Sequence, residues 1–280
     1  MKTILLTGST GFVGSAILKV LIKKYKIICL NRKKVKQIKN VKNIYFKDYD
    51  DLNKKLKSIK VDVVIHCATH YIKTHSHKDI QKLADSNLIF GNIILENLKQ
   101  MKVKLFINFT TVWENFNGVK DNFYNLYSVY KKNFTNILNF YKKLTPEINF
   151  YNLYISDTFG DNDIRPKIVN ILRKNYKNNK ITNIVSSNLY INLLNIIDII
   201  EAISIILINK SKPGEYNLVN SKNFYFTNII KKINEQNKNK IKVKWLSKKR
   251  VKDKIYNKTR LKGWTPKKSE INDIINLIKH

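Results

Sequence analysis

Three glycines near the amino terminus are spaced as in a turn that holds phosphate groups. Gly8, Gly11 and Gly14 lie in the stretch LLTGSTGFVGS, directly after a short apolar run over residues 3–7. At the end of a first strand, such glycines let the chain turn sharply, let the backbone approach a pyrophosphate and let the next helix pack closely. The free N–H groups at the start of that helix would face the anion. The pattern predicts a dinucleotide site, with a plain turn as the alternative, and the expected contacts are Gly8, Thr10, Gly11, Phe12, Val13 and Gly14.

The residues that end the second expected strand bear on which dinucleotide binds. A carboxylate at this place would bond the ribose 2′-hydroxyl of NAD, but the stretch CLNRKK has Asn31 and Arg32 instead. A guanidinium can form two parallel hydrogen bonds to a 2′-phosphate, so the sequence favours NADP(H) over NAD(H). In the alternative, Arg32 is only solvated and Asn31 binds the 2′-hydroxyl of NAD.

A tyrosine and a lysine further along the chain have the spacing needed for proton transfer. In NLYSVYKKN, Tyr127 and Lys131 are four residues apart, so a helix places both side chains on one face. A tyrosine with its usual pKa near ~10 exchanges protons poorly at neutral pH. A neighbouring ammonium stabilises the phenolate and lowers that pKa. The pair therefore predicts proton exchange with a substrate oxygen.

Apolar runs that alternate with amphipathic stretches indicate the elements that position these residues. Strands separated by helices of ten or more residues form a parallel sheet covered on both faces, and right-handed crossovers then give a doubly wound, Rossmann-type α/β fold. The predicted strands cover residues 3–7, 26–30, 43–46, 61–67, 104–109 and 150–155. The predicted helices cover residues 13–23, 78–99, 125–143, 165–180 and 195–208.

The carboxyl-terminal part is less regular, and it predicts a second, smaller α/β lobe. We expect residues 1–160 to form the dinucleotide-binding domain, with residues 186–217 returning to it. Residues 161–185 and 218–280 are expected to form the substrate lobe.

Charge is the unusual feature of the composition. The 280 residues include 53 Lys and Arg but 20 Asp and Glu, which gives a formal net charge of +33. The lysines are scattered and arginine is scarce, whereas proteins that bind nucleic acid concentrate arginine and aromatic residues on one face. We therefore predict no nucleic-acid partner, although the positive field would attract a small molecule that carries phosphate.

The cysteines and the longest apolar stretch bear on the compartment. Cys29 and Cys67 lie in apolar, strand-like runs, which is typical of a reduced, cytoplasmic protein. Residues 189–208 are apolar, but four polar groups within them would be costly in lipid: Asn192, Asn195, Asp198 and Glu201. We predict a cytoplasmic protein without a membrane span.

Four histidines lie close together in the loop HCATHYIKTHSH, which raises the hypothesis of a zinc site. They are His66, His70, His75 and His77. They follow a buried strand rather than lie on one helix face, and no second cluster completes a coordination sphere. We therefore predict ordinary loop histidines and no metal.

Motifs along almost the whole chain resemble the extended short-chain dehydrogenase/reductase family of sugar-nucleotide enzymes. The matching stretches are TGSTGFVG, VDVVIHCAT, DSNLIFGN, YSVYK and GWTP. Within that family, FINFTTVWENFNG, NFYNLYSVYKKNF and DTFGDNDIRPKIVNIL are similar to the CDP-abequose and CDP-paratose synthase group. The resemblance implies an oxidoreductase that uses NADPH to reduce the C4 ketone of a nucleotide-linked 6-deoxy or 3,6-dideoxy sugar for surface polysaccharide. It also implies a homodimer, formed by a pair of long helices packed across a two-fold axis.

The resemblance further implies roles for individual residues. Tyr127 would be the acid and base, Lys131 would hold the nicotinamide ribose and Asn87 would support the proton relay. The residues implied around the cofactor include Asp48, His66, Cys67, Ala68 and Thr69. Those implied around the substrate's sugar and phosphates are Thr69, Trp113, Asp157, Thr158, Arg165 and Lys167. Trp113 has packing as its alternative role.

One position departs from the family pattern. The family has a catalytic serine or threonine just past the fifth strand, where Phe109 stands if Trp113 aligns with the family's tyrosine. Thr111, with Thr110 in reserve, would supply the hydroxyl after a shift of one residue. Related dehydratases carry an Asp–Glu pair beside that threonine, and no carboxylate occurs here until Glu114, which disfavours a dehydratase.

Two other functions stay open at this point. An NAD-dependent sugar-nucleotide 4-epimerase would retain its cofactor and need none added. A nucleotide-binding protein without catalysis would regulate or scaffold a partner, and Phe109 is the residue that keeps this hypothesis open.

Overall fold

The computed structural model describes residues 1–236, 240–252 and 254–279. The chain divides into two compact units, which we describe one at a time. The first unit comprises Met1–Asn115, Asp121–Tyr154 and Lys212–Tyr216, and the second comprises Phe116–Lys120, Ile155–Ser211 and Asn217–His280. The functional division into a dinucleotide domain and a substrate lobe stays a prediction.

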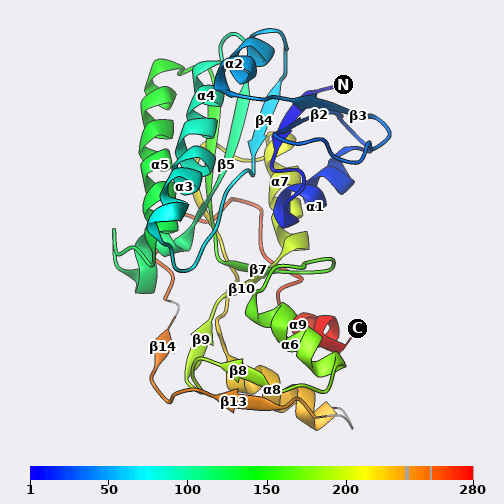
Figure 1. Ribbon diagram of the computed structural model, residues 1–280, viewed down its shortest axis with the longest axis vertical. Coiled ribbons are helices and arrows are strands. Elements are labelled where there is room, and N and C mark those ends of the chain that lie inside the picture. Colours follow the sequence, from blue (N-terminus) through cyan, green and yellow to red (C-terminus); the bar gives the residue numbers. More distant parts are fainter. Residues whose placement is uncertain (237–239, 253, 280) are drawn as a thin grey trace. The chain divides into compact units, whose positions relative to one another are not determined.

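A seven-stranded sheet forms the centre of the first unit (Figure 1). Its strand order is β11-β6-β5-β4-β1-β2-β3, and the neighbouring pairs from β3 to β5 run parallel. This arrangement confirms the predicted doubly wound α/β fold, because the chain starts in the middle of the sheet and extends it to both sides. The strands are β1 (Thr3–Thr7), β2 (Lys26–Asn31), β3 (Val41–Tyr45), β4 (Val63–His66), β5 (Leu105–Thr111), β6 (Asn149–Ile155) and β11 (Gly214–Leu218).

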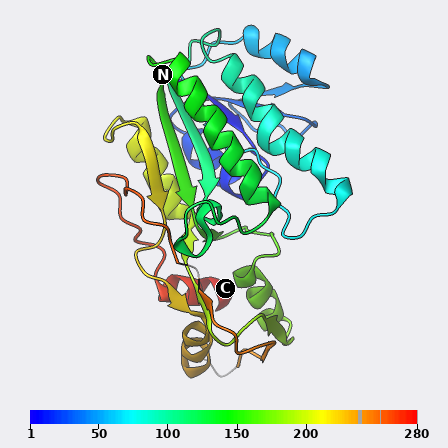
Figure 2. The same cartoon turned by 90° about the vertical axis from the view of Figure 1, so that its left-hand side faces the viewer.

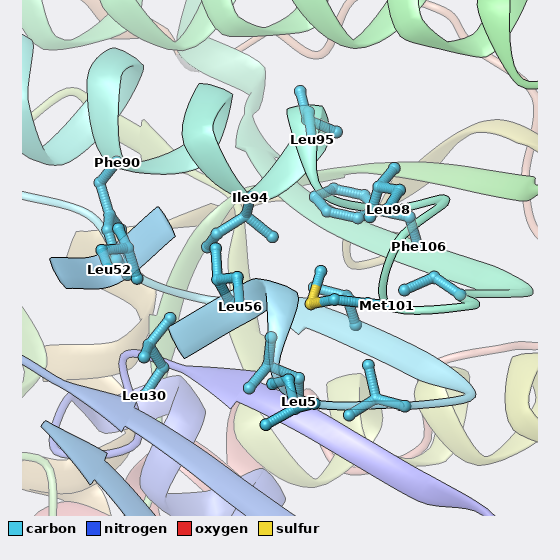
Figure 3. Close-up of a cluster of buried hydrophobic side chains, with 14 of the residues drawn as sticks. Leu5, Leu30, Leu52, Leu56, Phe90, Ile94, Leu95, Leu98, Met101 and Phe106 are labelled. Carbon is cyan, nitrogen blue, oxygen red and sulfur yellow. The ribbon is translucent and has the colours of Figure 1, made fainter. Parts of the chain in front are cut away.

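Helices cover both faces of this sheet. α4 (Phe90–Glu96) and α5 (Leu126–Leu144) lie side by side over one face, whereas α1 (Phe12–Leu21) lies on the other (Figures 1 and 2). Alternate strand residues and apolar helix residues interlock beneath α4, and removing this apolar area from water stabilises the fold. Figure 3 shows part of this core, including Leu5, Leu30, Leu52, Leu56, Ile94 and Phe106.

Two elements differ from the sequence-based expectation. The predicted long helix over residues 78–99 is broken into a 3₁₀ turn at His77–Asp79, α3 (Ile80–Ala84), a π-helical turn at Asp85–Ile89 and α4. The chain also forms α2 (Tyr49–Lys57), which the sequence analysis missed because its face has few apolar residues. Asp48 caps α2, and acidic residues at its start with lysines at its end stabilise this short helix.

The second unit has its own apolar core among short strands and helices. Its strands form three small sheets, β10-β7, β12-β9-β14 and β13-β8, and its core includes Phe159, Leu172, Phe226 and Ile274. Its strands are β7 (Asp157–Phe159), β8 (Thr182–Ile184), β9 (Leu189–Ile191), β10 (Leu193–Asn195), β12 (Phe224–Tyr225), β13 (Val243–Trp245) and β14 (Val251–Lys252). Its helices are α6 (Ile168–Lys177), α7 (Ile196–Leu207), α8 (Phe226–Gln236) and α9 (Ile271–Lys279).

A buried carboxylate in α7 holds the segment GWTPKKS in place. Asp198 accepts hydrogen bonds from the backbone N–H groups of Lys267 and Lys268, and the Trp264 indole donates to the backbone oxygen of Asp198 at 2.8 Å. Asp198, one of the polar residues that interrupt the apolar stretch, is thus used inside the fold. Within the described residues, no helix combines the length and the hydrophobicity needed to cross a membrane.

Candidate functional site

The glycine turn closes tightly at the start of α1. Gly8 has a φ of +67°, and a Cβ built on it would lie 2.7 Å from the backbone nitrogen of Ala68. A Cβ on Gly14 would lie 2.2 Å from the carbonyl oxygen of Gly8, so neither position accepts a larger residue. α1 begins after Gly11 without a side-chain cap and without an acidic residue in its first turn. Its first N–H groups can therefore bind an anion, and the turn fits the pyrophosphate of a dinucleotide.

The two residues at the end of β2 differ in whether their side chains already have hydrogen-bond partners. The amide of Asn31 is buried, accepting from the Ser9 hydroxyl at 3.1 Å and donating to the Asn43 side chain at 2.9 Å. Arg32 is exposed, and within the described part of the chain it makes no hydrogen bond or ion pair. Its positive charge acts on Tyr49, whose pKa is nevertheless raised to about 12, mainly by burial. The guanidinium is thus the group that remains free for a ligand.

Four other residues predicted to contact the cofactor lie around this turn and β3. Thr10 is exposed in the turn, and Phe12 and Val13 are half-buried at the start of α1. Asp48 is exposed, and its Oδ1 accepts from the Asp51 backbone N–H at 2.8 Å as the cap of α2. Their contacts with a cofactor stay predictions.

His66, at the end of β4, is a buried core residue. Its Nδ1 lies 3.0 Å from the Thr7 hydroxyl, which also accepts from the Ala68 backbone N–H at 3.0 Å. Burial, followed by the positive charge of Lys131, lowers the pKa of His66 to about 3, so the ring is neutral at physiological pH. The bonds of His66 fix the ends of β1 and β4 beside the glycine turn, and its ring packs among Phe90, Phe106 and Phe134.

Asn87 lies in the π-helical turn and ties down the loop after β4. Its side-chain oxygen accepts from the Thr69 hydroxyl at 2.6 Å and from the His70 backbone N–H at 3.1 Å. Its side-chain nitrogen donates to the His70 carbonyl oxygen at 3.0 Å. Asn87 is therefore a buried clamp on Thr69, and its predicted part in a proton relay stays untested. Burial raises the pKa of the neighbouring Cys67 thiol, which keeps it protonated.

The two threonines that end β5 make different bonds. The Thr110 hydroxyl donates to the carboxylate of Glu114, and both residues are buried. The Thr111 hydroxyl accepts from the Trp113 backbone N–H at 3.2 Å, which leaves its own proton available to a substrate oxygen. Phe109 is buried within the strand, two residues before Thr111. This geometry favours Thr111 as the hydroxyl donor.

α5 begins with a capping box that fixes the residues of its first turn. The Asn125 side chain accepts from the Ser128 backbone N–H, while the Asn125 backbone N–H donates to the Ser128 hydroxyl. Asn125 also donates to the Ile72 carbonyl oxygen at 3.3 Å, so the loop after β4 is held at the start of the helix. Tyr127 lies in this turn and is half-buried.

Lys131 is buried one turn further along α5. Burial lowers the pKa of its ammonium to about 8, while the negative charge of Glu114 acts to raise it. The lysine also acts electrostatically on His66 and Cys67, so its charge lies near the end of β4. A buried ammonium in this position can stabilise a phenolate on the same helix face.

Tyr127 has an aromatic neighbour, Tyr71, that the sequence did not identify as a candidate. Tyr71 meets it in an edge-to-face contact, with 5.2 Å between ring centroids. Tyr71 also packs on Trp113 at 5.7 Å, and Trp113 packs on Tyr124 at 5.0 Å. The sequence signal that could have identified Tyr71 was the presence of an aromatic residue in the polar loop HYIKTHSH. Glu114 was likewise identifiable as a carboxylate four residues after Thr110.

The residues of the second unit predicted to bind substrate are linked to one another. Arg165 donates from Nε to the Asp163 carboxylate at 2.7 Å, and from a terminal nitrogen to the Thr158 hydroxyl at 2.8 Å. The Lys167 ammonium donates to the Asp157 carboxylate at 2.7 Å. Both cations are thus neutralised by carboxylates within the unit, and their contacts with substrate phosphates stay predictions.

The loop histidines do not gather into a metal site. His70 is half-buried, His75 and His77 are exposed, and His66 lies in the core. Burial is the main cause that lowers the pKa of His70. Among the described residues, no group of three or more His, Cys, Asp or Glu side chains is arranged to hold a metal ion.

Comparison with known proteins finds relatives over most of the chain. The NAD dependent epimerase/dehydratase family matches residues 4–219. The chain is 32% identical to the CDP-abequose synthase of Yersinia pseudotuberculosis over 219 residues, covering 76% of this chain and 75% of that protein. It is 27% identical to the CDP-abequose synthase of Salmonella muenchen over 222 residues, covering 78% and 74%.

Solved structures share the fold at lower sequence identity. The UDP-glucose 4-epimerase of Thermus thermophilus, in complex with NAD, superposes with a TM-score of 0.81. The superposition covers 99% of each chain, and the sequences are 18% identical. At this identity the likeness extends to the architecture alone.

Proposed function

The chain belongs to the NAD dependent epimerase/dehydratase family of NAD(P)-dependent sugar-nucleotide oxidoreductases, and we propose that it reduces the C4 ketone of a nucleotide-linked deoxysugar with NADPH. The substrate is a 4-keto-6-deoxy or 4-keto-3,6-dideoxy sugar destined for surface polysaccharide. The observation that carries the proposal is the placement of Tyr127 and the buried ammonium of Lys131 one turn apart on α5. Two relatives that are CDP-abequose synthases support the choice of substrate class.

The residues of the first unit can perform the proton half of the reduction. When bound, the nicotinamide cofactor supplies the hydride that the carbonyl carbon receives. Tyr127 gives its phenolic proton to the carbonyl oxygen, which turns the ketone into an alcohol. Lys131 stabilises the resulting phenolate, and the Thr111 hydroxyl donates a hydrogen bond to the same oxygen as charge develops.

NADPH is proposed as the cofactor because of the end of β2. Arg32 makes no hydrogen bond or ion pair among the residues that the structure describes, so its guanidinium can bind a 2′-phosphate, and the residues that end β2 include no carboxylate that would repel that group. The amide of Asn31 is occupied by Ser9 and Asn43, which weakens the alternative in which it selects NAD.

Stoichiometry separates this proposal from its rivals. The purified protein is mixed with NADPH and CDP-4-keto-3,6-dideoxyglucose, and we expect one NADPH consumed for each alcohol formed. An epimerase would copurify with NAD and consume no added cofactor. A protein without catalysis would bind NADPH but leave a panel of CDP-, dTDP-, GDP- and UDP-linked keto-sugars unchanged.

Two further features of the enzyme are proposed. Phe140 and Leu144 expose 57% and 51% of their surface on α5, which supports a homodimer formed through this helix. Light scattering, which measures the molar mass in solution, tests the proposed homodimer.

Cys29 and Cys67 are free thiols, which supports a reducing, cytoplasmic location.

A further inference from the structure

One edge of the seven-stranded sheet carries a dense group of lysines. In a parallel sheet, each helix returns the chain to the start of the next strand, so helix ends and strand starts meet at one edge. This edge holds the connections from α1 to β2, α2 to β4, α4 to β5 and α5 to β6, and the amino terminus lies there (Figures 1 and 2). Its exposed lysines, which we call the lysine edge, are Lys2, Lys23, Lys24, Lys26, Lys57, Lys60, Lys99, Lys102, Lys104, Lys142 and Lys143.

Backbone hydrogen bonds hold the strand starts of the lysine edge side by side. The Lys26 N–H donates to the Lys2 carbonyl oxygen at 3.2 Å. The Lys104 N–H donates to the Asp62 carbonyl oxygen at 2.9 Å, and the Asp62 N–H donates to that of Thr3 at 2.9 Å. Because these bonds continue the sheet, the lysines project from one ordered surface.

Few acidic side chains offset this positive charge. Among the described residues, those at the lysine edge are Asp62, Glu96 and Glu147. Asp62 accepts from a backbone N–H at the start of β1 at 2.8 Å, and Glu96 accepts from the Tyr141 hydroxyl at 2.5 Å. Glu147 lies 4.0 Å from the Lys99 ammonium in an exposed pair, which contributes little. The lysine edge therefore has a large excess of positive charge.

Helix stabilisation accounts for only part of this cluster. A cation in the last turn of a helix interacts favourably with the helix dipole. This explanation fits Lys57 at the end of α2, and Lys142 and Lys143 at the end of α5. It does not explain Lys26 and Lys104, which stand at the starts of β2 and β5. The gathering of both groups on one edge fits an extended anionic partner.

We propose that the lysine edge binds the surface of a bilayer that contains anionic phospholipids. Each lysine held near such a surface raises the binding constant about fivefold, so several lysines on one face suffice for adsorption. A nucleic acid fits less well, because its binding proteins use arginine and stacked aromatic rings, and the described residues of the lysine edge include no arginine.

The candidate functional site remains accessible in this arrangement. The glycine turn, Arg32, His66 and Thr111 stand where β1, β2, β4 and β5 end, at the opposite edge of the same sheet. A protein adsorbed through the lysine edge would direct this site away from the bilayer. The proposal concerns a separate surface, so it holds whether or not the proposed reduction is correct.

Vesicle sedimentation without NADPH or sugar tests the proposal. The protein is mixed with vesicles of phosphatidylcholine alone, or with about 30% phosphatidylglycerol added as the anionic lipid. We expect binding to the anionic vesicles only, and its loss when the salt concentration rises from about 0.1 M to about 1 M. A variant that combines Lys23→Gln, Lys26→Gln, Lys102→Gln and Lys104→Gln should bind about 10²–10³-fold more weakly.

A matched variant separates the lysine edge from the overall charge. Lys174→Gln, Lys177→Gln, Lys180→Gln and Lys232→Gln remove four exposed lysines from the second unit, and this variant should bind almost as the wild type does. Thermal unfolding and NADPH titration confirm that both variants are folded. An absence of wild-type binding to anionic vesicles, or an equal loss in the two variants, would overturn the proposal. Tighter binding to a DNA duplex than to the vesicles would overturn it in favour of a nucleic acid.

Discussion

Two arginines show how the same residue type serves two purposes in this chain. Arg32, at the end of β2, is exposed and makes no hydrogen bond or ion pair within the described residues. Arg165, after β7, bonds to Thr158 and to both oxygens of the Asp163 carboxylate, whose side chain is fully buried. The first arginine is available for a ligand, whereas the second stabilises the loop in which it lies.

The comparison extends to the two regions. The first unit leaves several groups available around the glycine turn and α5: the N–H groups at the start of α1, the Arg32 guanidinium and the Thr111 hydroxyl. In the second unit, Lys167 and Arg165 are matched with Asp157 and Asp163. Available groups indicate binding and chemistry, and matched groups indicate structure, so variants in the two regions should fail in different ways.

The largest effect is expected at Tyr127. Tyr127→Phe removes the transferable proton, so kcat should fall by about 10²–10⁴-fold. NADPH affinity should change little, because the glycine turn and Arg32 are untouched. Steady-state kinetics and fluorescence titration measure the two quantities, with Tyr130→Phe on the same helix as the control. A rate near that of the wild type would exclude Tyr127 as the acid.

The next effect is expected at Arg32. Arg32→Gln removes a charge-assisted contact with the 2′-phosphate, so the Kd for NADPH should rise by about 10–100-fold, while the Kd for NADH stays the same. Lys34→Gln, two residues on, controls for the loss of one positive charge. If NADPH and NADH affinities fell equally, Arg32 would have no part in cofactor choice.

In the second unit, Arg165→Gln should reduce the stability of the protein rather than its affinity for the cofactor. The buried carboxylate of Asp163 would lose its charged side-chain partner and keep only the backbone N–H of residue 165, so the free energy of unfolding should fall by about 1–3 kcal/mol. NADPH affinity should be unchanged. Denaturant unfolding and cofactor titration check both parts. A stable Arg165→Gln protein with weak substrate binding would instead assign this arginine to the substrate.

The smallest effect is expected at Glu114. The pKa of Lys131 is about 8, so its ammonium is lost, and the rate should fall, as the pH rises through that value. The charge of Glu114 raises the Lys131 pKa, so Glu114→Gln should lower it further and move the alkaline fall in kcat/KM to lower pH. A pH–rate profile that did not move would show that Glu114 does not act on Lys131.

Local sequence signals predicted most of the first unit. The apolar run that ends before Gly8 predicted β1, and the five residues YSVYK indicated that Tyr127 and Lys131 lie on one face of a helix. The fold was predictable because a parallel sheet buried on both faces leaves apolar strands between amphipathic helices.

Features that depend on tertiary contacts were not predictable. Asn87 lies in the π-helical turn, and its side chain forms hydrogen bonds with residues 69 and 70. These residues are distant from Asn87 in the sequence, so a local pattern does not reveal the bonds. Arg165 differs from Arg32 because the Asp163 carboxylate pairs with Arg165, whereas Arg32 has no ion pair among the described residues. Tyr71 lies in a loop whose histidines are its most prominent sequence feature, and its contact with Tyr127 forms only where that loop meets α5 in the folded chain.

Isotope transfer shows directly whether NADPH donates the hydride that reduces C4 of the sugar. The enzyme is incubated with NADPH that carries deuterium on the transferred position, together with CDP-4-keto-3,6-dideoxyglucose, and the product is analysed by mass spectrometry and NMR. We expect one deuterium per product molecule, bonded to C4 of the sugar. A sugar product formed without deuterium at C4 would contradict it, because the hydride would then have come from a source other than the added NADPH.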